Sequence, residues 1–255
     1  LRWLQRTGVG VDHARADPPN AGVVVTNAGG VPARAVAEHA WLGLLAIAKD
    51  ASTLFAHQRE RVWRAGDARR MFDTKLVVVG TGRIGRAIAL RAPAFEVDVV
   101  GINQTGATSV GFARTLAMHD PIELAPIMRS EKPDHVVVAV PLTSSTKNLV
   151  NAAVIDALPK HAAVVDVSRA GVVDSDALSA ALRADRLRGA FVDVAPREPL
   201  PPDDPLWTVP RLMITPHVAY AFPEEAEHVG ELAATNLRRL LRGEPLENVV
   251  DVSHA

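Results

Sequence analysis

The chain contains no cysteine, and this absence excludes several kinds of chemistry. Without thiols there is no disulfide framework, no thiolate nucleophile and no cysteine-based metal site. An excess of charge is also missing, because 28 basic residues face 29 acidic ones and the net charge is −1. A nearly neutral chain lacks the basic surface that nucleic acids require, so we predict no nucleic-acid partner. We also predict no metal site.

Long hydrophobic runs and targeting signals are missing as well. The longest apolar run, Ala40–Ala48, is too short to cross a bilayer, and no signal-peptide pattern is visible. We therefore predict no membrane partner and a cytoplasmic location, with which a cysteine-free composition is compatible. The chain opens at Leu1 in a strand-like segment and without a methionine, so we expect that residues preceding it are absent from this sequence.

The sequence does have enough apolar residues for a sizeable core. Its 255 residues are 48% hydrophobic, which suits one large or two smaller domains. Short β-branched runs alternate with helical patterns. We expect strands near residues 1–5, 23–26, 76–79, 97–102, 135–140, 163–167, 189–194 and 211–215, and helices near 35–49, 121–129, 151–158, 174–184 and 223–242. This alternation predicts an α/β protein with a doubly wound parallel sheet.

Three features have no clear assignment from the pattern. The polar segment Ala51–Phe72 is interpreted as a surface arm that contacts a partner or, equally, as a solvated loop. The segment Gly106–Asp120 is too irregular for any element to be predicted. The pair Glu38-His39 lies on a largely buried helix, and we interpret it as structural.

The most informative stretch runs from Leu76 to Ala89. A β-branched strand is followed by Gly80, Gly82 and Gly85 in the spacing G-x-G-x-x-G, and then by a helical pattern. In this context the first glycine allows a tight turn, the second admits a pyrophosphate, and the third lets the helix approach the strand. The helix N-terminus then offers N–H groups to the phosphates. The alternative is a glycine-rich surface turn, but the strand and helix around it favour a dinucleotide site.

The identity of the dinucleotide depends on the end of the following strand. An acidic residue about 20 positions after the glycines usually binds the adenosine ribose. Here that position is Asn103, followed by Gln104 and Thr105. A missing carboxylate removes the repulsion of a 2′-phosphate, although no Arg or Lys follows to bind one. We therefore favour NADP(H) over NAD(H), with both kept open.

Polar residues follow several of the later strands. In parallel sheets, ligands bind at the carboxyl ends of the strands. The polar residues at these ends are Thr143 and Thr146, Ser168 and Arg169, Asp193, and His217. Their common position predicts a cleft that faces the nicotinamide.

Three ionisable residues suit the reduction of a 2-oxo acid by hydride. Arg169 can bind a carboxylate with its bidentate fork and polarise the carbonyl group. His217 can donate the proton to the oxygen, and Glu198 can support that histidine. Each has an ordinary alternative: a salt bridge for Arg169, a solvated loop charge for Glu198, and a helix cap or core position for His217. Their joint placement after strands favours the catalytic interpretation.

At this point the sequence resembles the D-isomer-specific 2-hydroxyacid dehydrogenases, a family that includes glyoxylate/hydroxypyruvate reductases and phosphoglycerate dehydrogenases. The resemblance runs from Thr7-Gly8-Val9-Gly10-Val11-Asp12 to Glu247-Asn248-Val249-Val250. Its motifs are Ala35–His39, Gly80–Gly85, Pro141–Thr146, Val167–Asp174, Asp193–Pro201 and Thr215-Pro216-His217. It implies a Rossmann-type NAD(P)-binding domain over residues 30–217. Residues 1–29 and 218–255 would then be part of a smaller, flavodoxin-like substrate domain.

The resemblance also implies roles for individual residues. Arg169, Glu198 and His217 would bind the substrate, support the histidine and act as acid/base, respectively. Val9 and Gly10 would meet the substrate carboxylate with their backbone amides, together with Arg169 and His217. Cofactor contacts would come from Gly80, Gly82, Arg83, Ile84, Gly85, Asn103, Val140, Pro141, Thr146, Ser168, Arg169, Asp193 and His217, with Asp193 at the nicotinamide amide. Family members are typically homodimers joined through the cofactor domain.

The chain departs from the family at three points. The family's chains carry several dozen more N-terminal residues, Asn103 replaces the usual acid, and Ala195 stands where a bulky aromatic is usual. Two other interpretations remain open. One is a dinucleotide-sensing, corepressor-like interaction protein on the same fold, because fold alone does not decide function. The other is oxidation of formate or phosphite, which needs no proton donor paired with an acid, so Glu198 disfavours it.

Overall fold

The structure is a computed structural model that describes residues 1–10, 19–20 and 22–252. Val11 and Asp12 of the first predicted motif lie outside the described residues. The chain divides into two compact units, one of residues 1–35 with 220–255 and one of residues 36–219. Each unit is described by itself below.

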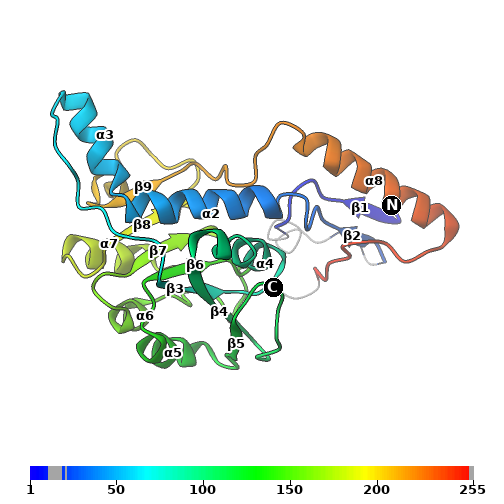
Figure 1. The fold of residues 1–255 in the computed structure, drawn as a ribbon. Helices are drawn as coiled ribbons and strands as arrows, with labels where there is room; N and C mark the ends of the chain where they lie inside the picture. The colour runs from blue at the N-terminus through cyan, green and yellow to red at the C-terminus, as the bar shows by residue number, and fades with distance from the viewer. Residues whose placement is uncertain (11–18, 21, 253–255) are drawn as a thin grey trace. The chain divides into compact units, whose positions relative to one another are not determined.

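The larger unit is built on one sheet of seven parallel strands (Figure 1). Along the chain these strands are β3 Thr74–Val79, β4 Val97–Asn103, β5 Arg114–Ala117, β6 His135–Val138, β7 Ala163–Asp166, β8 Gly189–Val192 and β9 Leu212–Ile214. Their order in the sheet is β5-β4-β3-β6-β7-β8-β9. The chain thus builds outward from β3 in one direction and then returns to start again beside it at β6. This reversal is the topological switch point at which such sheets bind ligands.

Helices cover both faces of this sheet. They are α2 Ala33–Ala48, α3 Ala51–Glu60, α4 Arg83–Ala89, α5 Leu124–Glu131, α6 Ala152–Ala157, α7 Ser175–Arg183 and the 3₁₀ turns η1 Ala92–Phe95, η2 Pro121–Glu123 and η3 Pro205–Thr208. Of these helices, α3 does not cover the sheet but extends away from it beyond the end of α2 (Figure 1). Successive strand side chains alternate between the faces, so Val77 and Val79 pack in one apolar cluster with α5, α6 and α7. Leu76 and Val78 pack in the other, with α2 and α4.

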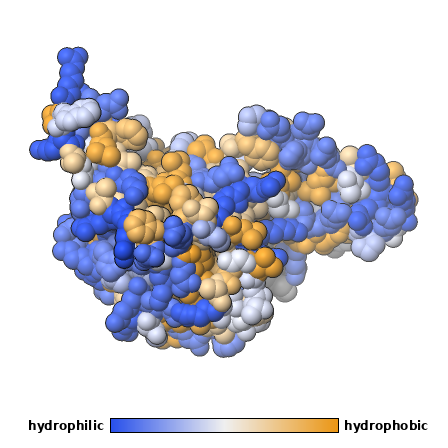
Figure 2. Space-filling view, in the orientation of Figure 1, coloured by the Kyte–Doolittle hydropathy of each residue, from blue (hydrophilic) through white to orange (hydrophobic). Residues whose placement is uncertain are grey.

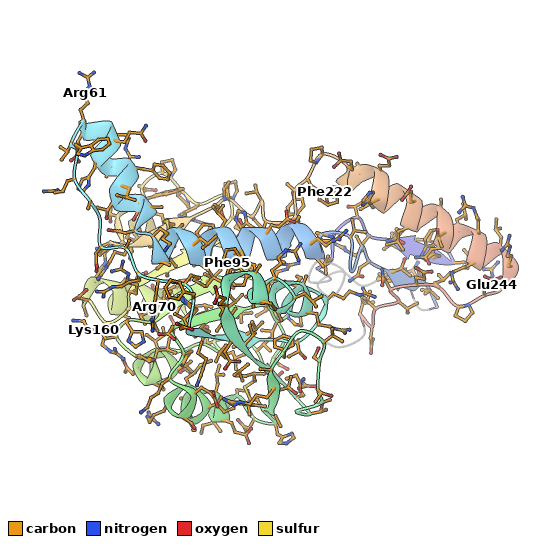
Figure 3. All side chains as sticks on the ribbon, in the orientation of Figure 1. Arg61, Arg70, Phe95, Lys160, Phe222 and Glu244 are labelled. Atoms are coloured by element: carbon orange, nitrogen blue, oxygen red, sulfur yellow. The ribbon has the colours of Figure 1, made fainter. Side chains whose placement is uncertain are left out.

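Particular side chains explain the close packing of α2 against the sheet. Trp41 of α2 stacks on Phe95 with ring centroids 4.5 Å apart, and Phe95 is labelled below α2 in Figure 3. The Trp41 indole N–H also donates to the carbonyl of Ile88 at 3.1 Å. A Cβ at Gly43 would come within 2.6 Å of the Phe191 ring, so only glycine lets α2 lie this near to β8. Each fully buried side chain such as Leu44 contributes about 2 kcal/mol relative to exposure.

In its described residues, the smaller unit contains two parallel strands, β1 Trp3–Gln5 and β2 Val24–Thr26, and one long helix, α8 Glu225–Arg242. Asn236 of α8 is fully buried. Its Nδ2 donates to Gln5 Oε1 and to the Glu247 carbonyl, both at 3.1 Å, and so joins the helix to β1 and to the C-terminal segment. The helix ends at Gly243, whose φ of 70° is the left-handed conformation that glycine adopts without strain.

The predicted fold class, a doubly wound parallel sheet, is confirmed. The structure differs from the sequence patterns in two segments. Ala51–Phe72 is only half loop, because Ala51–Glu60 is the helix α3 and residues 61–72 contain no helix or strand. Gly106–Asp120, where no element was predicted, contains the edge strand β5. The reason is tertiary: Arg114 of β5 pairs with the buried Glu131 of α5, a contact that no local pattern reveals.

Candidate active site

The glycine turn after β3 has the geometry that a dinucleotide requires. Gly80 has a φ of 104°, and a Cβ there would lie 2.6 Å from the Ala139 carbonyl oxygen. A Cβ at Gly85 would lie 1.9 Å from the Gly80 carbonyl oxygen, so α4 approaches the strand as closely as backbone allows. Gly82 instead faces open space, with nothing within 4 Å of a Cβ built on it. Two glycines thus shape the turn, and the third leaves room beside the start of α4, which fits a bound pyrophosphate.

Asn103 joins the end of β4 to this turn. Its Nδ2 donates to Thr81 Oγ1 at 2.9 Å and to the Ala107 carbonyl at 3.0 Å. Its Oδ1 accepts from the backbone N–H groups of Thr105 and Gly106. The side chain therefore organises the loop where an adenosine ribose would lie, and it does so without a negative charge. Arg83, at the first position of α4, is exposed beside the same turn.

The residues after β6 form a closed polar turn. Thr146 Oγ1 donates to the Pro141 carbonyl at 2.6 Å and accepts from the Thr143 N–H at 2.7 Å. Val140 lies against the glycine turn, because its Cγ1 would be 2.8 Å from a Cβ at Gly80. This turn lies at the switch point, next to the turn that follows β3. The cofactor contacts expected of Val140, Pro141 and Thr146 stay predictions.

Backbone hydrogen bonds hold the later strand ends side by side. The Asp193 N–H donates to the Asp166 carbonyl at 2.9 Å, and the Thr215 N–H donates to the Val192 carbonyl at 2.9 Å. The loops that leave β7, β8 and β9 therefore start next to one another at the carboxyl edge of the sheet. These loops carry Ser168 and Arg169, Asp193 and Glu198, and His217.

His217 and Glu198 form a close pair. Nδ1 of His217 lies 2.7 Å from Glu198 Oε2, and Glu198 Oε1 accepts from the Ala195 N–H at 3.0 Å. Both side chains are more than a third exposed, so the pair is reached by solvent. A carboxylate on Nδ1 fixes the proton there and leaves Nε2 as the nitrogen that exchanges a proton with a ligand. His217 has a φ of 53°, a conformation imposed by the turn that holds it.

Asp193 holds the turn around His217 through hydrogen bonds to residues on both sides of it. Its side chain is 2% exposed, and its oxygens accept from Thr215 Oγ1 at 2.5 Å, the Val218 N–H at 3.0 Å and the Ala219 N–H at 2.8 Å. His39 Nε2 lies 2.9 Å from Thr215 Oγ1 and 3.4 Å from Asp193 Oδ1. Burial raises the pKa of the Asp193 carboxyl, but hydrogen bonds from His39, Thr215 and the backbone outweigh it and hold the pKa below its usual value.

Of the Glu38-His39 pair, only His39 reaches this network, while Glu38 is exposed and pairs with Arg91 at 3.1 Å. Sequence reasoning missed the contact of His39 with Asp193, because nothing in the local pattern links a helix residue to a distant strand end. The nicotinamide contact expected of Asp193 stays a prediction.

Arg169 follows β7 by three residues. Its Nη1 donates to the Ser168 carbonyl at 2.7 Å, and its side chain is half-buried. Val9 and Gly10 lie in the smaller unit, where Asn27 Nδ2 donates to the Val9 carbonyl at 2.6 Å. Their expected contact with a substrate carboxylate stays a prediction. Across the residues described, no three His, Asp or Glu side chains are close enough to bind a metal ion. No helix in the described part of the chain is long and apolar enough to span a membrane.

Comparison with known proteins adds to this geometry. Residues 42–219 match the model of the D-isomer specific 2-hydroxyacid dehydrogenase family, NAD binding domain. The D-3-phosphoglycerate dehydrogenase of Methanocaldococcus jannaschii is 31% identical over 99% of this chain, and the glyoxylate reductase of Korarchaeum cryptofilum is 31% identical over 98%. The chain spans 48% of the first relative and 76% of the second.

A solved structure is similar throughout. The D-isomer specific 2-hydroxyacid dehydrogenase from Xanthobacter autotrophicus Py2, in complex with NADPH and MES, has a TM-score of 0.85 and 31% identity. The similarity covers 99% of this chain and 78% of that one.

Proposed function

Since the chain belongs to the D-isomer specific 2-hydroxyacid dehydrogenase family, we propose that it transfers a hydride between NAD(P)H and a small 2-oxo acid, which gives a D-2-hydroxy acid. The observation that carries the proposal is the His217–Glu198 pair at 2.7 Å, on the sheet edge that also holds Arg169. Such a pair is what proton transfer to a reduced carbonyl needs, and it argues against a protein that only senses a dinucleotide, although corepressors of this fold can keep such residues.

The proposed roles follow from the positions of the side chains. Gly82 and the start of α4 would hold the pyrophosphate, and the nicotinamide, when bound, supplies or accepts the hydride. Arg169 binds the substrate carboxylate and polarises the keto oxygen with its guanidinium. His217 gives its Nε2 proton to that oxygen, while Glu198 keeps the other ring nitrogen protonated and stabilises the positive imidazolium.

A panel of 2-oxo acids tests this proposal. Glyoxylate, hydroxypyruvate, pyruvate and phenylpyruvate are each offered with NADH and with NADPH, and oxidation of the cofactor is followed by absorbance. We expect turnover at ordinary enzymatic rates, above about 1 per second, with at least one acid. Cofactor binding without turnover of any acid would contradict the proposal and favour the dinucleotide-sensing alternative.

We further propose that NADP(H) is preferred over NAD(H). The neutral Asn103 amide, tied into its own loop, presents no carboxylate to a 2′-phosphate, and the similar Xanthobacter structure contains NADPH. The ratio of the two dissociation constants, measured by fluorescence titration, tests this. Tighter binding of NAD(H) would overturn the preference.

We also propose a homodimer joined through α2 and α3. Figure 2 shows hydrophobic residues gathered over this region, and three of its large apolar side chains are well exposed: Leu42 at 54%, Leu54 at 40% and Phe55 at 59%. An apolar patch of this kind marks a protein–protein contact. Sedimentation should find a dimer that Phe55→Glu converts to monomer, whereas Ile122→Glu, at an exposed site outside the patch, leaves it intact.

For the location of the protein in the cell, we propose the cytoplasm, and cell fractionation tests it.

A further inference from the structure

Asp166, the last residue of β7, is a buried carboxyl that none of the roles above uses. Its side chain is 3% exposed. Oδ1 accepts the Ser168 N–H at 2.9 Å and also the Ser168 hydroxyl. Beside it lies a cavity of about 10 Å³, whose lining is mostly apolar and includes Gly171 and Val194. The carboxyl is therefore fixed on one side by the loop that follows β7, and a small, mostly apolar cavity lies next to it.

The same loop residue connects Asp166 to Arg169. Ser168 is held at both its N–H and its hydroxyl by the carboxyl, and its carbonyl accepts from Arg169 Nη1 at 2.7 Å. The guanidinium is thus hydrogen-bonded to a peptide segment whose orientation Asp166 fixes. Loss of the carboxyl would free that segment, and with it the orientation of Arg169.

Two charged groups face Asp166. Arg169, on the loop after its own strand, attracts its negative charge, and Asp193, at the end of the neighbouring strand β8, repels it. Burial is the largest influence and raises the pKa of the Asp166 carboxyl to about 6, against the opposing effect of the hydrogen bonds from Ser168. The charge of Asp166 therefore changes within the range of pH in which enzymes are assayed.

We infer that Asp166 is a positioning residue for Arg169: it holds the guanidinium through Ser168, and its charge competes with the substrate carboxylate for that guanidinium. The inference rests on the proposed function, because it takes Arg169 to be the group that binds the substrate. A carboxyl protonated on Oδ2 still accepts hydrogen bonds through Oδ1, so positioning persists in both states. Only the competing charge is lost on protonation, and the affinity for a substrate anion should rise as the pH falls.

Three variants separate geometry from charge. Asp166→Asn keeps an acceptor oxygen of the same shape but is neutral at every pH. Asp166→Ala removes the acceptor. Asp156→Asn makes the same change at an exposed aspartate of α6 and serves as the matched control. KM and kcat for glyoxylate are measured at saturating NADPH from about pH 5.5 to 8, which brackets the expected titration.

In the wild type, KM should increase as the pH rises through about 6. At pH 7.5 the KM of Asp166→Asn should be about threefold lower than that of the wild type, as expected when one nearby like charge is removed. The ratio of the two KM values should return towards one at low pH. Any group that titrates alike in both proteins contributes equally to the two KM values and cancels in this ratio. In Asp166→Ala, KM should be about tenfold higher, the loss expected for one hydrogen bond, with a smaller change in kcat.

Two further readouts do not need turnover. The Kd of oxalate, measured by calorimetry with NADP present, should follow the same pattern as KM. The melting temperature tests the titration itself: because folding raises the pKa of this acid, the wild type loses stability as the pH rises from about 4 to 6. Asp166→Asn should therefore melt increasingly above the wild type as the pH rises to 7.

The outcomes distinguish the two proposals. If the wild type turns over no 2-oxo acid, the proposed function fails, while the oxalate affinities still test the role of Asp166. If the wild type is active but Asp166→Asn has the same pH profile of KM and oxalate binding as Asp156→Asn, the inference is wrong and the proposed function stands. If Asp166→Ala does not fold, Asp166→Asn decides the matter by itself.

Discussion

His135 and Asp166 are both buried titratable residues, and their strands β6 and β7 are paired. They lie at opposite ends of these strands, His135 at the amino edge of the sheet and Asp166 at the carboxyl edge. His135 begins β6 and is 6% exposed, and within the described chain neither of its ring nitrogens has a hydrogen-bond partner. Burial lowers its pKa to about 4, opposed by the charge of Asp134. Asp166 ends β7, and its carboxyl is hydrogen-bonded into a loop that reaches Arg169.

The comparison shows that a perturbed pKa does not by itself mark a site. Burial shifts both groups in the direction that disfavours their charged form. Only at the carboxyl edge do hydrogen bonds continue from the buried group to side chains that solvent, and therefore a ligand, can reach. The predictions below test this distinction between the two edges.

Removal of an imidazole should lower kcat strongly at the carboxyl edge and hardly at all at the amino edge. His217→Ala should lower kcat by about 10³-fold, within the range of general acid catalysis, while the Kd of NADPH changes little. His135→Leu, which removes an imidazole from the amino edge, should leave kcat within about twofold of the wild type. Steady-state kinetics and fluorescence titration measure both. Equal losses of kcat and cofactor affinity in His217→Ala would mean that His217 is structural.

Two glycines of the turn after β3 should separate an effect on stability from an effect on cofactor binding. Gly85→Ala should destabilise the protein by at least about 3 kcal/mol, because its Cβ would overlap the Gly80 carbonyl. Gly82→Ala should fold normally, because a Cβ there meets nothing within 4 Å, but it should bind NADPH more weakly. Denaturant unfolding and cofactor titration test the pair. A Gly82→Ala variant with unchanged affinity would contradict the place given to the pyrophosphate.

Burial of His135 at the amino edge should affect how the free energy of unfolding depends on pH. The pKa of His135 is depressed on folding, so its contribution to stability is complete above the unfolded value near 6.5 and is lost as the pH falls to about 4. The free energy of unfolding should fall by about 3 kcal/mol across this window. In His135→Leu this part of the decrease should be absent. Denaturation curves at several pH values make the comparison, and an unchanged slope would count against the buried, neutral histidine.

The smallest effect should come from Glu38, which shares a sequence motif with His39. Its carboxylate pairs with Arg91 at 3.1 Å, but the side chain is 69% exposed. Exposed pairs contribute little, so Glu38→Ala should change the free energy of unfolding by less than about 0.5 kcal/mol. His39→Ala, which removes the contact with Asp193 and Thr215, should cost more. Equal effects in the two variants would show that the Asp193 network adds nothing.

The parts of the fold that sequence predicts well are those with a local signature. The valine strand before Gly80 forms as predicted, and a helix forms at the glycine motif, although it begins at Arg83 and so includes Gly85. The strand β5 has none: it is a four-residue edge strand of mixed polarity, held by its pairing with β4 and by the contact of Arg114 with Glu131. Helix α3 is polar and lacks a side-chain N-cap, so its sequence resembles a loop.

The candidate site divides in the same way. Arg169, Glu198 and His217 could be proposed because each follows a strand or lies in a distinctive motif. The contacts of His39 with Asp193 and of Asp166 with Ser168 had to come from the structure. Asp166 lies in a run of buried apolar residues, where a carboxyl is recognisable only as an exception. What it contacts depends on how the chain turns after β7, and composition does not determine that.

The account depends most on Arg169 and His217 acting on the same small molecule. A crystal structure of the chain with NADP and oxalate tests this directly. We expect one carboxylate of oxalate on the Arg169 guanidinium and an oxygen of the same molecule within hydrogen-bond distance of His217 Nε2, beside the nicotinamide ring. Oxalate bound away from either side chain, or a dinucleotide that does not lie across the Gly80–Gly85 turn, would contradict it.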